Sequence, residues 1–143
     1  MKKTLLEVKK LAVFKDSEGR LFETLRVDDA LFRGEFGQNL VSFVKYGVIK
    51  GLHLHHKTTE YTTCIQGKIL YAAIKEGEKP IIEKIILDSE EPLLIRTDPE
   101  IWHGFTPLTK NGAMVLYTMN LPYNPKDTDI EDKYPYAFGN IWK

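Results

Sequence analysis

Hydrophobic residues occur along this chain in short runs, separated by turns of glycine, proline and charged residues. Runs rich in β-branched and aromatic residues predict β-strands. We expect strands at 48–55, 60–65, 67–74, 81–87, 93–95 and 113–119, and a hairpin or a pair of edge strands in 5–27 around a turn at 16–20. No stretch keeps the helical period long enough to predict a helix of more than about two turns. The pattern predicts an all-β sandwich or barrel.

The length and the charge balance of the chain limit the number of domains and the kinds of partner that the protein can have. A chain of 143 residues fits one domain over 1–143. Its 20 Lys and Arg balance 20 Asp and Glu, so no overall field favours a nucleic acid or an anionic membrane. No apolar run is long enough to span a membrane, and Glu7, Lys9 and Lys10 interrupt the N-terminal stretch before it resembles a signal peptide. The lone Cys64 cannot form an internal disulfide, and we expect a cytoplasmic protein.

Candidate chemistry concentrates in the segment 47–67, GVIKGLHLHHKTTEYTTCIQG. Because strand side chains alternate, His53 and His55 leave the same face, and a returning strand that begins at Glu60 brings a carboxylate beside them. Two imidazoles and a carboxylate are ligands that Zn, Fe, Mn or Ni accepts. The same group also serves proton transfer, so the residue types leave both chemistries open.

The spacing of this segment resembles the first motif of the cupin superfamily, G-x5-H-x-H-x4-E-x6-G. Its five anchors stand at Gly47, His53, His55, Glu60 and Gly67. In the second cupin motif a histidine completes the site, and His103 is the residue that matches. The resemblance implies a single-domain antiparallel jelly-roll barrel with its active site in the mouth.

A narrower resemblance covers 33–53, where RGEF and SFVKYGVIKGLH are similar to RGxF and SxSxxGVLRGLH of the dTDP-4-dehydrorhamnose 3,5-epimerase family. It implies a cofactor-free epimerase in which His53 is the base and Tyr123 is the acid. The substrate implied is a dTDP-linked 4-keto-6-deoxy sugar or a similar keto sugar, with Arg33 and Lys50 holding its diphosphate. His55 and Glu60 would line the substrate pocket, and His103 would complete the catalytic group.

The chain departs from this family at the positions that do its chemistry. The family usually has glutamine at the position of His55 and a catalytic lysine at that of Glu60, and it has arginine where this chain has Lys50. The aspartate that orients the family's histidine lies beyond a terminal IxWP stretch, in a segment that this sequence lacks. The sequence therefore leaves open which residues replace that aspartate and that lysine.

Because of these departures, three further hypotheses about the function stay open. Nucleotide-sugar 3,4-ketoisomerases share a similar His-x-His segment. A metal-dependent cupin, such as a dioxygenase, a decarboxylase or a phosphosugar isomerase, would use a divalent Fe, Mn, Ni or Zn held by His53, His55, Glu60 and His103. A non-catalytic sugar-binding cupin is the third hypothesis.

Two expectations concern packing and assembly. Cys64, Trp102 and Phe105 are expected to be buried, because a lone cysteine most often acts as a small hydrophobic residue and the two aromatics flank a motif histidine. The cupin resemblance implies a homodimer, and a two-fold dimer is also the commonest soluble oligomer. A neighbouring subunit would then be able to supply Arg33 to the site.

Overall fold

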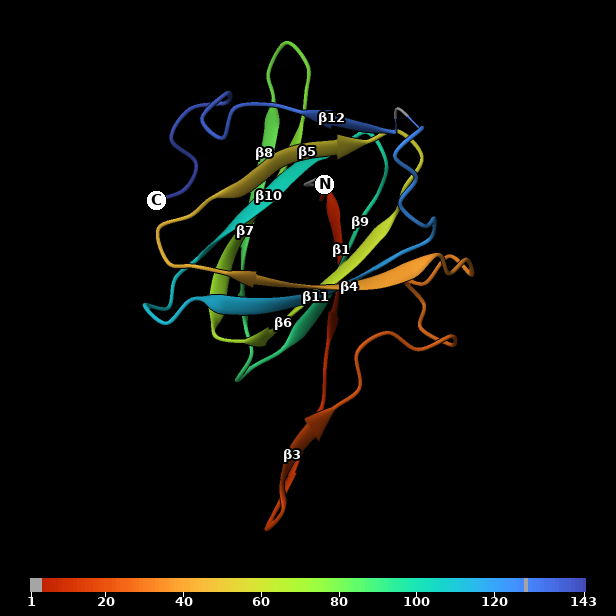
Figure 1. The fold of residues 1–143 in the computed structure, drawn as a ribbon, viewed down its shortest axis with the longest axis vertical. Helices are drawn as coiled ribbons and strands as arrows, with labels where there is room; N and C mark the ends of the chain where they lie inside the picture. The colour runs from red at the N-terminus through yellow and green to blue at the C-terminus, as the bar shows by residue number, and fades with distance from the viewer. Residues whose placement is uncertain (1–3, 128) are drawn as a thin grey trace.

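The computed structural model describes residues 4–127 and 129–143, and within these ranges it contains twelve β-strands and no helix (Figure 1). No segment of the described chain is therefore a helix able to cross a membrane. The strands are β1 (Leu6–Lys10), β2 (Val13–Asp16), β3 (Gly19–Phe22), β4 (Gln38–Val44), β5 (Lys50–His55), β6 (Glu60–Gln66), β7 (Lys68–Lys75), β8 (Ile81–Asp88), β9 (Leu93–Thr97), β10 (Trp102–Pro107), β11 (Ala113–Met119) and β12 (Ile130–Asp132).

Ten strands form two antiparallel sheets that face each other, in the orders β1-β9-β6-β11-β4 and β12-β5-β10-β7-β8. This arrangement is the jelly roll that the sequence predicted. The strand expected at 113–119 is β11, and the turn expected after His56 leads into β6 at Glu60. The sequence pattern did not indicate β12, and 102–107 was expected as a motif and not as strand β10.

The space between the sheets is filled by apolar side chains. Fully or almost fully buried members of this core include Ile69, Tyr71, Leu87, Ile95 and Val115, and Cys64 and Phe105 belong to it as expected. Burying each large aliphatic side chain contributes about 1.5–3 kcal/mol, so this interior stabilises the barrel wall that carries the polar site.

The outer face of the second sheet is also covered. Leu52 and Leu54 of β5 pack there with Trp102 and with Ile141 and Trp142 of the C-terminal segment. The alternation LHLH therefore matches two different environments, one apolar and one polar. The leucines face a layer formed by the chain end, while His53 and His55 face the barrel interior.

A β-bulge changes the alternation at the start of β5. His103 pairs with His53, but the next residue, Gly104, pairs with Gly51, so one residue of β5 has no partner. The strands approach closely here, and a Cβ atom on Gly51 would lie 2.9 Å from the Cα atom of Gly104. Because of this extra residue, Lys50 lines the same cavity as His53, although an odd number of positions separates them.

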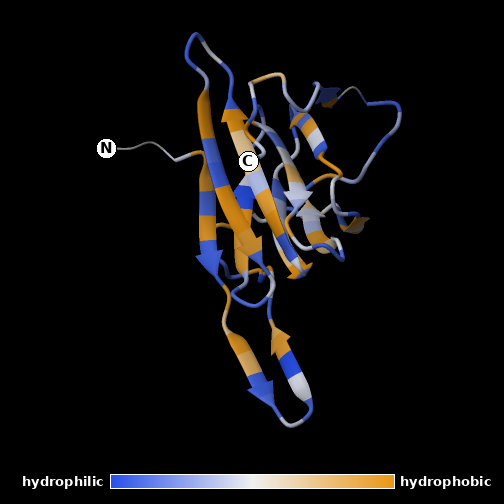
Figure 2. Ribbon diagram, turned by 90° about the vertical axis from the view of Figure 1, so that its left-hand side faces the viewer, coloured by the Kyte–Doolittle hydropathy of each residue, from blue (hydrophilic) through white to orange (hydrophobic). Residues whose placement is uncertain are grey.

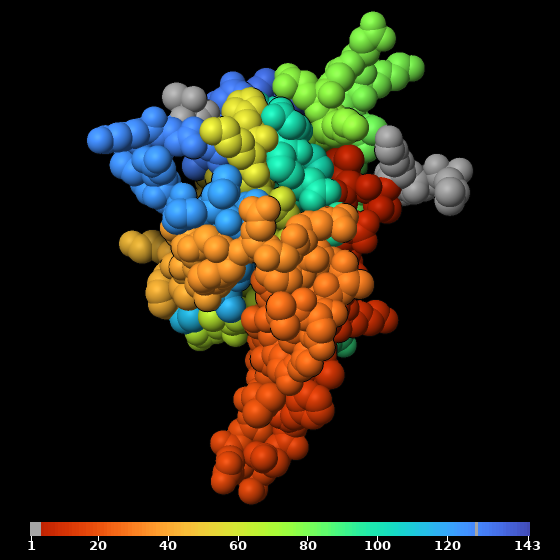
Figure 3. Space-filling view, turned by 90° about the vertical axis from the view of Figure 1, so that its right-hand side faces the viewer, coloured from red at the N-terminus to blue at the C-terminus, as the bar shows by residue number. Residues whose placement is uncertain are grey.

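Strands β2 and β3 form a hairpin, one of the two arrangements expected in 5–27, and this hairpin projects away from the barrel (Figures 1 and 3). Both of its strands carry hydrophobic residues beside hydrophilic ones (Figure 2). Phe14 and Leu21, which pair across the hairpin, are 59% and 60% exposed. The protein thus presents an apolar projection that its own barrel does not cover.

Candidate active site

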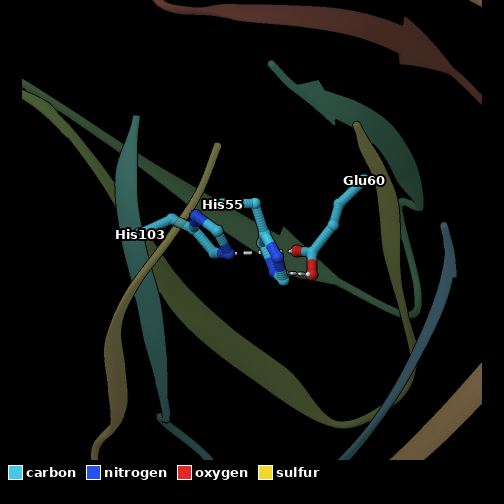
Figure 4. Close-up of side chains that lie close together, drawn as sticks. All are labelled: His55, Glu60 and His103. Carbon is cyan, nitrogen blue, oxygen red and sulfur yellow. Dashed lines mark hydrogen bonds and ion pairs between the residues drawn. The ribbon is translucent and has the colours of Figure 1, made fainter. Parts of the chain in front are cut away.

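Three buried side chains from three strands meet inside the barrel: His55 of β5, Glu60 of β6 and His103 of β10 (Figure 4). The Glu60 carboxylate lies between the imidazoles, with Oε1 3.1 Å from His55 Nε2 and Oε2 3.1 Å from His103 Nε2. The outer nitrogens are also paired. His103 Nδ1 is 3.0 Å from the carbonyl oxygen of Ile101, and His55 Nδ1 is 3.0 Å from Oδ2 of Asp129.

The electrostatics of this group are dominated by its buried carboxylate. Burial by itself would raise the pKa of Glu60, but the charge and hydrogen bonds of His103 and His55 outweigh it and lower that pKa well below its usual range. Burial tends to lower the pKa of His55, yet hydrogen bonds with Glu60 and Asp129 raise it overall. The two imidazoles therefore stabilise the charged form of the buried Glu60 carboxylate.

Tyr71 closes the other side of this group. Its ring stacks on His103 at a centroid distance of 6.2 Å, and its hydroxyl lies 2.7 Å from Thr97 Oγ1. Burial, aided by the charge of Glu60, raises the pKa of Tyr71 well above its ordinary value. Tyr71 therefore stays protonated, and its hydroxyl already has a partner.

His53 stands apart from the group of three. Its Nδ1 atom is 2.7 Å from Oδ1 of Asp132, and its side chain is 37% exposed. Asp132 is in register with His53 because β12 pairs with β5. The sequence analysis left open which residue replaces the family's orienting aspartate, and Asp132, 79 residues away along the chain, occupies that position beside His53. No residue pattern around Asp132 signalled the contact.

A small cavity of about 50 Å³ lies beside His53. The polar side chains that line it are Lys50, His53, Glu60, Thr62, Tyr71, His103 and Tyr117. A space of this size holds only a small group of atoms, so a larger ligand would extend outside it. Tyr117, which the sequence analysis did not select, shares this cavity with His53 and Tyr71, and its hydroxyl lies 3.2 Å from Lys50 Nζ.

Two other predicted site residues lie elsewhere. Tyr123 is 65% exposed and lines a separate hollow of about 180 Å³ together with His55 and Asp129. Arg33 is exposed and lines a hollow with residues such as Asp29 and Arg96, none of which borders the cavity beside His53. Within one chain, the structure therefore joins His53, Lys50, Glu60 and His103 around the cavity, and it leaves out Tyr123 and Arg33.

The group could also hold a metal ion. One ligand atom each from His55, Glu60 and His103 lies within 4.8 Å of the other two, a donor set that suits Zn or Fe. The predicted fourth ligand, His53, is not part of this set. Cys64 is no candidate ligand, because burial raises the pKa of its thiol to about 11.

Comparisons with known proteins place the chain among its relatives. A chain from Haloferax volcanii described as a probable low-salt glycan biosynthesis epimerase is 25% identical over 137 residues, which cover 92% of this chain and 86% of the relative. A dTDP sugar isomerase structure from Desulfovibrio desulfuricans superposes with a TM-score of 0.84 at 21% identity, covering 92% of this chain and 85% of the other.

A second solved structure is the dTDP-6-deoxy-D-glucose-3,5-epimerase of Legionella pneumophila in complex with dTDP-4-keto-L-rhamnose. It superposes with a TM-score of 0.80 at 19% identity and covers 94% of this chain and 76% of its own. The family model described as dTDP-4-dehydrorhamnose 3,5-epimerase matches residues 4–133, which include every strand of both sheets. The chain therefore belongs to the dTDP-4-dehydrorhamnose 3,5-epimerase family.

Proposed function

We propose that this chain epimerises a dTDP-linked 4-keto-6-deoxy sugar by removing a proton from a carbon next to the ketone. The observation that carries the proposal is the His53–Asp132 pair at the cavity. Asp132 engages Nδ1, and Nε2 of His53 makes no hydrogen bond to any described residue. An imidazole held in this way is oriented to accept a proton at Nε2.

In the proposed step the C–H bond beside the ketone breaks, and its proton moves to His53 Nε2. The electron pair forms the carbon–carbon double bond of an enolate, and the ketone oxygen takes the negative charge. A proton returned to the same carbon from the opposite face inverts the centre. Tyr117 is the proposed acid because it lines the same cavity as His53, and Tyr123, the acid that the sequence resemblance implies, is the alternative.

Family membership supports both the substrate class and the absence of a cofactor. Epimerases of this family are cofactor-free, and the proposed steps need only side chains. The Legionella structure holds a dTDP-linked keto sugar, and the Haloferax relative is described as an epimerase of glycan biosynthesis. A dTDP-linked keto sugar is accordingly the substrate class to test first.

Deuterium uptake tests the proposal. In heavy water, dTDP-4-keto-6-deoxyglucose incubated with the protein should take up deuterium at C3 or C5, and His53→Asn should slow the uptake by about 10²–10⁴-fold. No uptake across a panel of dTDP-linked and other nucleotide-linked keto sugars would reject epimerisation. Movement of the carbonyl from C4 to C3 in the product would instead identify a 3,4-ketoisomerase, which uses the same first proton transfer.

The close group of His55, Glu60 and His103 supports a second candidate, a metal-dependent cupin enzyme. Elemental analysis of untagged protein distinguishes the two. Near-stoichiometric Fe, Mn, Ni or Zn that is lost in His55→Ala favours the metal enzyme, whereas an active protein without metal excludes it. Tight binding of a dTDP sugar without turnover would point to a sugar-binding cupin.

The proposed working unit is a homodimer of single cupin domains in the cytoplasm. The projecting hairpin supports the dimer, because its exposed Phe14 and Leu21 would be buried against a second copy. A dimer would also allow Arg33 to bind the diphosphate in the partner's site. Light scattering that finds only a 16.5 kDa species would reject the dimer.

A further inference from the structure

Lys50 is the charged residue of the cavity that has no opposite charge beside it. Its Nζ atom donates hydrogen bonds to Ser42 Oγ at 2.6 Å and to Tyr117 OH at 3.2 Å. None of the ion pairs among residues 4–127 and 129–143 includes Lys50. His55 and His103, by contrast, both face the carboxylate of Glu60. The cavity beside His53 therefore contains one cation that is free to interact with a negative charge.

A count of hydrogen-bond donors shows what this cation has left to offer. The ammonium group has three N–H donors, and Ser42 and Tyr117 take two of them. The hydroxyls of Ser42 and Tyr117 lie 2.6 Å apart and share one proton between them. If Ser42 donates that proton, the phenolic proton of Tyr117 stays free. One N–H of Lys50 and the hydroxyl proton of Tyr117 are then available to a molecule in the cavity.

A second polar group in the same cavity lacks a partner. Thr62 is buried, lines the cavity, and its hydroxyl makes no hydrogen bond. Buried polar groups nearly always have partners, so a hydroxyl without one, on a residue that lines the cavity, is a candidate partner for a polar atom of a ligand. Lys50 and Thr62 thus line the same cavity with hydrogen-bonding capacity that other described residues do not use.

The proposed reaction needs donors of this kind. When His53 takes the proton, the electron pair of the C–H bond moves into the enolate and the ketone oxygen becomes negative. Fixed donors aimed at an oxygen that gains charge usually contribute the largest part of such catalysis, because they need no reorganisation during the reaction. An imidazole that already faces the Glu60 carboxylate stabilises the enolate oxygen less well than Lys50, which has no carboxylate beside it.

We propose that Lys50 is a catalytic residue that donates its remaining N–H to the ketone oxygen and so stabilises the enolate, with Ser42 as the residue that positions it. This role rests on the proposed epimerase function and replaces the diphosphate contact expected for Lys50. The β-bulge between β5 and β10 is what makes it possible. With strict alternation Lys50 would leave the face opposite to His53.

The test compares Lys50→Met and Lys50→Arg with Lys45→Met, an exposed control outside the cavity. Two quantities are measured for each variant: deuterium uptake by saturating dTDP-4-keto-6-deoxyglucose, and the Kd for dTDP alone. Lys50→Met should slow uptake by about 10²–10³-fold, as expected for the loss of one such donor. It should leave the Kd for dTDP within about twofold, Lys50→Arg should recover part of the rate, and Lys45→Met should match the wild type.

Each other outcome has a definite meaning. Uptake by Lys50→Met within a few fold of the wild type overturns the role of Lys50 while leaving the epimerase proposal intact. A Kd for dTDP that rises tenfold or more, with uptake unchanged at saturation, identifies Lys50 as a diphosphate ligand. No uptake by the wild type rejects the epimerase function and this inference with it. If Lys50→Met does not fold, Ser42→Ala decides: an unchanged kcat overturns the proposal, and a reduced kcat at constant KM supports it.

Discussion

Two clusters of polar side chains share the barrel interior and differ in how completely they are paired. In the cluster of His55, Glu60 and His103, each imidazole has partners for both nitrogens and each carboxylate oxygen has a histidine. In the cluster of His53, Lys50 and Tyr117, Nε2 of His53 and one N–H of Lys50 make no hydrogen bond to another described residue and are available to a ligand. The first cluster is suited to hold strands β5, β6 and β10 in place, and the second is suited to act on a substrate.

The difference shows that the most conspicuous group in the sequence need not do the chemistry. Each carboxylate oxygen of Glu60 already has an imidazole nitrogen as a partner. His53 has one partner and an open nitrogen. The predictions that follow test this division, and they run from the largest expected effect to the smallest.

A matched pair of tyrosine variants tests which hydroxyl belongs to the reacting cluster. Tyr117→Phe should lower kcat by about 10²–10⁴-fold, because the proposed acid loses its proton. Tyr123→Phe should change kcat little, since Tyr123 is largely exposed and lines another hollow. Steady-state epimerisation measured on both variants decides the assignment, and the reverse result would restore Tyr123 as the acid.

Removing the central carboxylate tests the structural cluster. Glu60→Gln should lower the free energy of unfolding by about 3–5 kcal/mol, because two buried imidazoles lose the charge that compensates them. Urea denaturation followed by circular dichroism measures the change. Glu78→Gln, on an exposed turn, is the control and should be neutral. A Glu60→Gln protein as stable as the wild type would show that the cluster contributes little to the fold.

The Asp132 contact tests the orientation of the base. Asp132→Asn should lower kcat by about 10- to 100-fold, less than the about 10⁴-fold loss for a buried orienting aspartate in serine proteases, because solvent screens this exposed carboxylate. Asp132→Glu should recover part of the rate, and KM should change little. Equal rates for Asn and Asp at this position would show that His53 needs no orienting partner.

The pH dependence of stability should report the charges of the structural cluster. The raised pKa of His55 adds stability that is complete below its ordinary value of 6.5 and is lost as pH rises through the folded value. The lowered pKa of Glu60 adds stability that is complete above 4.5 and is lost as pH falls through the folded value. Thermal unfolding should show the largest difference between wild type and His55→Gln at pH 4.5–6.5.

The control for this experiment is His56, whose pKa is also raised, mainly by a hydrogen bond with Glu100. His56→Gln should keep the contribution of the buried cluster, whereas His55→Gln removes it. If the wild type and His55→Gln lose stability to the same extent as pH rises above 6.5, the contact between His55 and Glu60 is not the cause of that loss.

Local pattern was sufficient for much of the fold. The run 113–119 alternates toward the core and becomes β11, and the polar turn after His55 leads into β6. Alternation also placed His53 and His55 on one face, while His103 was expected only from the resemblance to the second cupin motif. The strands, the turn and the alternation depend on neighbours in the chain, so a sequence contains them directly.

Tertiary structure decided which of those side chains touch. The pairing of β12 with β5 brings Asp132 to His53, and the bulge opposite Gly104 turns Lys50 inward. The sheet order brings Tyr117 of β11 and Ser42 of β4 to Lys50 of β5, which belongs to the facing sheet. Strand order and register come from packing between segments far apart in the chain, and alternation within one strand contains no information about its partner.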